Sequence, residues 1–249
     1  MRAFRHGTCD STNERAFHAI AADDARHGDV HLATAQTSGR GRRGNAWWSP
    51  PGEGLYASLI WSPPVDATHP APEPASLTMA GGLAAMDVVQ AVGLTGAWLK
   101  WPNDLLIGDR KLAGVLVEAR GLDPARPTYV VGVGLNVRQS SFPGELQAER
   151  AVTSLLLEGH DVPLEDVTSR LLEALPARLA TTQSDPTALT HAFVTATGLV
   201  GMPVVVDGPT GEVRGTFHDL DLEAGVVVET ATGPQTIALA HVRALRRAE

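Results

Sequence analysis

Two lysine residues stand out in a chain that otherwise uses arginine for its basic positions. Of 20 Lys and Arg residues, only Lys100 and Lys111 are lysine. Lysine carries a compact charge on a flexible stem, which suits a phosphate or carboxylate site, although two ordinary exposed charges are the alternative. Both lie in one stretch, residues 100–118, KWPNDLLIGDRKLAGVLVE. Polar turns separate its short apolar runs, so the pattern predicts a hairpin that could bring both lysines to one ligand.

A second candidate site is the segment 36–45, QTSGRGRRGN, which contains three glycines and three arginines. Glycine costs entropy to fix and neighbouring arginines repel one another until an anion arrives, so the segment predicts a flexible, irregular anion-binding loop. An Arg-Gly segment that binds RNA and a solvated linker are the alternatives. The spacing matches neither the phosphate loop G-x-x-x-x-G-K-[ST] nor a dinucleotide-binding G-x-G-x-x-G after a strand.

A third feature is a strip of glycines in the apolar run 129–137. Side chains alternate across a strand, so Gly132 and Gly134 lie on one face with Asn136 next along it. Gly114 interrupts the strand that follows Lys111 in the same way. A flat ligand could lie on such a strip, and tight packing against a helix is an equal alternative.

The elements that must position these residues follow from periodicity. Ser11 and Glu14 predict a capping box that starts a helix ending near Gly28. The start of this helix could also bind a polar ligand. Further along, the pattern predicts strands at 30–34 and 54–61 and helices at 76–92, 164–179 and 186–197. From Gly201 onward, short β runs at 204–207, 213–218, 226–230 and 236–239 predict a small barrel, with a boundary near 198–202.

Composition limits the kind of protein. The 249 residues suffice for one large domain, or one domain with a small second one. A formal net charge of -8 argues against a general binder of nucleic acid or of anionic membranes. The single cysteine, Cys9, and the absence of a long apolar run or signal peptide predict a cytoplasmic protein. The nine histidines are scattered, so metal-dependent hydrolysis has little support.

Four blocks in order resemble the biotin protein ligase family, and together they cover most of residues 8–140. The blocks are Asp10-Ser11-Thr12-Asn13, Gln36 with Gly39-Arg40-Gly41-Arg42-Arg43-Gly44, Lys100-Trp101-Pro102-Asn103-Asp104 with Arg110-Lys111-Leu112-Ala113-Gly114, and Gly132 to Asn136. The resemblance implies a mixed α/β (α+β) fold. Its catalytic domain, residues 1–198, would be similar to class II aminoacyl-tRNA synthetases and lipoate ligases, and residues 199–249 would form an SH3-like β-barrel.

The same resemblance implies an activity. Biotin would react with Mg²⁺-bound ATP to give biotinyl-5′-AMP, and a lysine of the biotin carboxyl carrier protein of acetyl-CoA carboxylase would then take the biotinyl group. The family also suggests a homodimer. The block that starts at Asp10 lies only nine residues from the first residue of the sequence. This predicts a ligase without a DNA-binding repressor domain. A lipoate or octanoate ligase is the nearest rival, and an RNA-binding protein is the rival from another class.

Site residues carry over by resemblance as well. Lys111 and Arg40 are the two residues expected to be catalytic. Lys111 is expected to contact the biotin carboxylate and the α-phosphate, and Arg40 is expected to shield the activated intermediate. The residues expected at biotin are Ser11, Thr12, Asn13, Gln36, Gly39, Arg40, Gly41, Arg42, Lys111, Gly114, Gly132 and Gly134. Those expected at the nucleotide are Arg42, Arg43, Trp47, Lys100, Asn103, Lys111 and Asn136. No protein ligand to a metal is expected. Residues 199–249 contain Phe217 as their single aromatic residue, which leaves open what covers adenine.

Overall fold

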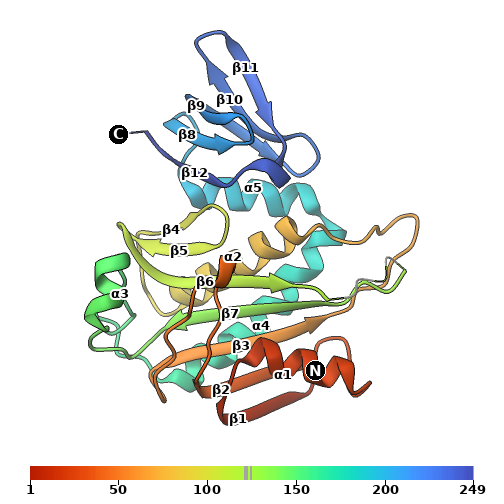
Figure 1. Ribbon diagram of the computed structural model, residues 1–249, viewed down its shortest axis with the longest axis vertical. Helices are drawn as coiled ribbons and strands as arrows, with labels where there is room; N and C mark the ends of the chain where they lie inside the picture. The colour runs from red at the N-terminus through yellow and green to blue at the C-terminus, as the bar shows by residue number, and fades with distance from the viewer. Residues whose placement is uncertain (121–122, 124, 249) are drawn as a thin grey trace.

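A seven-stranded sheet forms the main body of the protein (Figure 1). The computed structural model describes residues 1–120, 123 and 125–248. The strand order is β1-β2-β3-β7-β6-β5-β4, in which β1 and β2 are parallel and the other neighbours are antiparallel. The strands are β1 (Ala3–Cys9), β2 (Val30–Gln36), β3 (Gly54–Trp61), β4 (Ala97–Lys100), β5 (Asp104–Ile107), β6 (Arg110–Glu118) and β7 (Tyr129–Asn136).

Helices cover both faces of this sheet. On one face lie α2 (Pro74–Ala91) and α4 (Leu164–Ser184), which pack against each other, whereas α1 (Thr12–Ala21) lies against β2, β3 and β7 on the other (Figure 1). Successive side chains of β3 point to opposite faces of the sheet. Leu59 therefore joins the main apolar core, while Ile60 packs with Phe17 of α1 on the other face. The α1 face is the one that carries the glycines of β7.

The C-terminal residues form a second, antiparallel sheet of order β11-β10-β9-β8-β12. Its strands are β8 (Pro203–Gly208), β9 (Gly211–Asp221), β10 (Gly225–Thr230), β11 (Gly233–Ile237) and β12 (Ala244–Arg247). Helix α5 (Pro186–Thr197) lies between the two sheets and ends at Gly198, whose φ of 61° is left-handed (Figure 1). The predicted short strands are confirmed. The predicted barrel is not, since β11 and β12 remain edges and no pairing among the described residues closes the sheet.

Several predicted boundaries were wrong. Helix α1 ends at Ala21 rather than near Gly28. Ser11 is its N-cap but makes no side-chain capping bond, and the Glu14 carboxylate binds Arg40 and Arg120 instead of reaching back, so there is no capping box. Strands β1 and β12 and the short helix α3 (Gly144–Glu149) were not predicted from the sequence. Helix α4 continues through Pro176 beyond the predicted end. No helix of the described part combines the length and apolar character needed to cross a membrane.

Candidate active site

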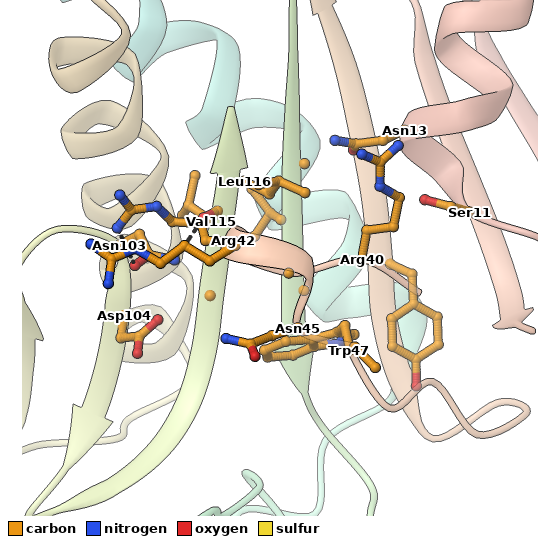
Figure 2. A pocket seen from close by; sticks show the side chains of 18 of the residues that line it. Ser11, Asn13, Arg40, Arg42, Asn45, Trp47, Asn103, Asp104, Val115 and Leu116 are labelled. Carbon is orange, nitrogen blue, oxygen red and sulfur yellow. Dashed lines mark hydrogen bonds between the residues drawn. The ribbon is translucent and has the colours of Figure 1, made fainter. Parts of the chain in front are cut away.

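A cavity of about 230 Å³ lies on the α1 face of the large sheet. Its wall brings together segments that are far apart in the sequence: the start of α1, the loop 37–46, the turn before β5, and strands β6 and β7. In Figure 2, Ser11, Asn13 and Arg40 lie on one side, Arg42, Asn103 and Asp104 on the other, with Asn45 and Trp47 between them. Most predicted site residues line it: Ser11, Thr12, Asn13, Gln36, Arg40, Gly41, Arg42, Arg43, Trp47, Asn103, Lys111, Gly114, Gly132 and Gly134.

The floor of the cavity is the glycine strip. Gly114 of β6 and Gly134 of β7 are direct partners in the sheet. A Cβ on Gly134 would lie 2.5 Å from the Trp47 ring, and one on Gly132 would lie 2.4 Å from Asn13 Oδ1. The strip is therefore where other groups of the site approach the backbone, and any side chain there would displace them. The buried Trp47 Nε1 has no hydrogen-bond acceptor among the described residues.

A β-bulge aims Lys111 into this cavity. The pairing of β5 with β6 shifts register between Leu105 and Leu106, so that Leu106 lies opposite Lys111. Leu112 and Ala113 consequently both belong to the apolar core, although successive strand residues normally point to opposite faces. The shift places Lys111 on the same face as Gly114, three residues away. Its backbone is held by bonds to Ala151 and Thr153.

The Lys111 ammonium is paired inside the site. Nζ lies 2.5 Å from Asp104 Oδ1 and 5.4 Å from the centroid of a Trp47 ring, and the side chain is only 14% exposed. Burial lowers the pKa of Lys111, and the Asp104 carboxylate opposes that decrease. The charge is thus kept in place by one specific partner.

The start of α1 is fixed by a network of buried polar groups. Gln36 Oε1 accepts a bond from the Thr12 amide at 2.8 Å, and Gln36 Nε2 donates to Ser49 at 2.8 Å. The Ser58 hydroxyl lies 2.7 Å from Thr12 Oγ1 and 2.5 Å from Asn13 Oδ1. Gln36 therefore joins the helix start to Ser49, in the segment that follows the loop, a structural role that does not require a ligand.

The loop 37–46, which we call the Arg40 loop, has a defined conformation. Trp47 N donates to Gly39 O at 2.9 Å, and Gly41 N donates to Asn45 O at 2.7 Å. Arg40 and Ala46 form an isolated β-bridge, and Arg42–Gly44 make a 3-10 turn. The loop contains no long helix or strand, in line with the prediction of irregular structure, and its flexibility stays a prediction. Within the loop, Gly39 packs closely against Trp47, since a Cβ on Gly39 would lie 2.3 Å from Trp47 O.

Two residues predicted for the nucleotide do not line the cavity. Lys100 ends β4 at the edge of the sheet, where its side chain is exposed, and it does not line the cavity with Lys111. It does contribute to lowering the pKa of Lys111. Asn136 is 4% exposed and donates to Thr153 O at 2.8 Å. By contrast, Arg42 reaches Asn103 Oδ1 at 3.3 Å (Figure 2).

The cavity also contains residues that the sequence did not single out. Asp104 was part of a recognised block, but its pairing with Lys111 depends on the bulge. Arg150 and Arg243 add two cations from distant segments, and Arg243 comes from the C-terminal part that carries the small sheet. No sequence pattern marks either arginine. Phe217 is 1% exposed in the core, so it does not reach the cavity.

The described residues contain no group of three or more His, Cys, Asp or Glu side chains placed to hold a metal ion. ATP-bound Mg²⁺ commonly relies on phosphate oxygens and water rather than on an all-protein cage. A role for Mg²⁺ accordingly stays a prediction.

Comparison with known proteins gives consistent matches. The family model described as the biotin/lipoate A/B protein ligase family matches residues 7–136. A biotin--[acetyl-CoA-carboxylase] ligase of Mycobacterium tuberculosis is 33% identical over 95% of this chain and 86% of the relative. One of Paracoccus denitrificans is 30% identical over 85% of this chain and 88% of the relative. The solved biotin protein ligase of Aquifex aeolicus in complex with biotin and ATP has a TM-score of 0.81 and 25% identity, covering 99% of both chains.

Proposed function

The chain belongs to the biotin/lipoate A/B protein ligase family, and from that premise we propose that it is an ATP-dependent biotin protein ligase. The names of the two relatives support biotin as the acid and acetyl-CoA carboxylase as the source of the acceptor. The Aquifex complex supports binding of both biotin and ATP by this fold. The observation that carries the proposal is the convergence of all four sequence blocks on one glycine-floored cavity with Lys111 aimed into it.

The geometry suits the joining of two anions. In the first half-reaction, a biotin carboxylate oxygen attacks the α-phosphorus of ATP, the bond to the bridging oxygen breaks, and pyrophosphate leaves. Negative charge grows on the phosphate oxygens, and a cation held in a low-dielectric site stabilises it. We assign this role to Lys111, with biotin on the side of Asn13 and Arg40 and the nucleotide on the side of Arg42 and Asn103.

The second half-reaction transfers the acyl group. The uncharged amine of an acceptor lysine attacks the acyl carbon of biotinyl-5′-AMP, AMP leaves, and the amine loses its proton to solvent. The acceptor is proposed to be the biotin carboxyl carrier protein of acetyl-CoA carboxylase. Arg40, in the loop over the cavity, would shield the intermediate from water until the acceptor arrives.

Five further predictions belong to the proposal. They are a domain boundary near residue 198, an SH3-like C-terminal domain, a cytoplasmic location, a homodimer, and the lack of repressor function. Size-exclusion chromatography with light scattering tests the homodimer. An electrophoretic mobility assay with biotin and ATP tests DNA binding, and a shifted band would contradict the prediction of no repressor.

The deciding experiment is pyrophosphate exchange into ATP with biotin, lipoate or octanoate as the single acid. We expect exchange with biotin, and a loss of roughly a hundredfold or more in Lys111→Ala, on the scale of removing one preorganised transition-state contact. Arg170→Ala is the control, because that arginine is exposed on α4 and lies outside the cavity wall. Exchange with lipoate or octanoate but not with biotin would reject the biotin assignment while leaving the family intact.

A further inference from the structure

Arg40 is held by carboxylates from two different elements. Its guanidinium donates to Glu118, the last residue of β6, at 2.6 Å, and it also binds Glu14 of α1. Glu118 and Glu14 are 18% and 24% exposed, and Arg40 is 37% exposed. The contacts are partly shielded, and they connect the Arg40 loop to both the helix and the sheet.

Glu118 has a second contact in the site. Its other oxygen, Oε2, accepts a bond from Asn13 Nδ2 at 2.8 Å, while Asn13 Oδ1 accepts one from Ser58 at 2.5 Å. These two bonds fix which end of the Asn13 amide faces which neighbour. One carboxylate therefore sets the position of a loop arginine and the orientation of an amide on the cavity wall.

Glu14 has a second partner as well. Arg120 donates to Glu14 at 2.5 and 3.0 Å, and the Arg120 guanidinium lies 4.0 Å from the centroid of the Phe17 ring. Arg120, and then Arg40, lower the pKa of Glu14, so this carboxylate stays ionised near neutral pH. When Arg40 moves away, Arg120 still compensates the charge of Glu14. The loop can therefore open without leaving Glu14 unpaired, while Glu118 keeps the bond from Asn13.

We propose that Glu118 and Glu14 are positioning residues that latch the Arg40 loop over the cavity through the Arg40 guanidinium. Glu118 additionally orients Asn13 toward the substrate. The proposal rests on the ligase function above for its consequence, which is retention of the activated acid. The latch itself is a property of the free protein and is testable without any substrate.

The first test is limited proteolysis of the ligand-free, full-length protein by trypsin, which cleaves after Arg40, Arg42 or Arg43 in the loop. Glu118→Gln and Glu14→Gln should each raise the cleavage rate roughly two- to fivefold, the range for losing one partly exposed ion pair. Higher salt should bring the wild type toward the variants. Glu165→Gln is the matched control, because Glu165 binds Arg5 away from the loop. Unchanged loop cleavage in both variants, with unchanged thermal midpoints, would overturn the latch.

The second test uses biotin and ATP with a bystander protein such as serum albumin. Both variants should increase biotinylation of the bystander, because the intermediate escapes from a loop that opens more often. Only Glu118→Gln should also raise the KM for biotin, since only Glu118 orients Asn13. Faster loop cleavage without added escape would overturn the role in retention. If the wild type shows no biotin-dependent activity at all, the ligase assignment fails while the proteolysis result still decides the latch.

Discussion

Lys111 Nζ lies 2.5 Å from Asp104 Oδ1, and the two residues come from neighbouring strands whose register shifts at this point. The pair places a buried cation beside the glycine strip and supplies the carboxylate that opposes the burial-induced decrease in its pKa. The Asp104 carboxylate thus stabilises the charged form of Lys111 in the proposed substrate site.

The first prediction concerns this pair. Asp104→Asn removes the group that raises the pKa of Lys111, so the pKa should decrease further. Lysine is charged below its pKa, and the alkaline limb of the activity profile should therefore move to lower pH. Biotin-dependent pyrophosphate exchange measured from about pH 7 to about pH 10 checks this. Asp109→Asn, at the exposed turn before β6, is the control, and a limb that does not move would contradict the role of Asp104.

A second prediction concerns the floor of the cavity. Gly134→Ala places a methyl group 2.5 Å from the Trp47 ring, so the indole must shift over the substrate position. We expect loss of biotin binding by calorimetry and a decrease of about 1–3 kcal/mol in the free energy of unfolding. Gly7→Ala is the matched control, because a Cβ at Gly7 meets nothing within 4 Å. Equal binding by both variants would show that the strip tolerates side chains.

The third prediction tests the contribution of the C-terminal part. Arg243 lines the cavity, whereas Arg246 on β12 binds Glu212. Arg243→Ala should weaken ATP binding by about tenfold, which corresponds to one charge-assisted hydrogen bond. Biotin binding should change little. Isothermal titration with each ligand measures both effects, and Arg246→Ala should leave both affinities unaltered. If the two arginine variants behave alike, Arg243 has no special place in the site.

The fourth prediction concerns stability in acid. Burial lowers the pKa of His31 to about 4 from an ordinary 6.5. Nδ1 of His31 lies 3.1 Å from Nε2 of His6. The unfolded chain therefore binds this proton first as pH falls. Neutral His31 makes its full contribution to the free energy of unfolding above pH 6.5 and loses it as the pH falls to about 4. The loss amounts to at most about 3 kcal/mol.

Urea unfolding at several pH values measures that loss. His31→Gln should show a flatter dependence of the unfolding free energy on pH across this window. His241→Gln, at an exposed position, should keep the dependence of the wild type. A variant at residue 31 with the same slope would assign the acid sensitivity to other groups.

Much of the local structure follows from the sequence alone. The apolar run of β3 and the alternate glycines of β7 predict strands because side-chain alternation is a short-range property, and Gly198 marks the end of α5 for the same reason. Strand β1 was not predicted, because its residues are exposed or half-buried and show no regular alternation of apolar and polar side chains.

The order of the four blocks identified the family, and with it most of the cavity wall. Tertiary structure decided which of those residues meet. The bulge that turns Lys111 toward Asp104, the Glu118 bond to Arg40, and the arrival of Arg243 from the C-terminal part all join residues whose separation along the chain leaves no periodic signal. Sequence patterns determine each strand and helix by local sterics, whereas contacts between distant side chains depend on how the sheet, helix and loop pack together.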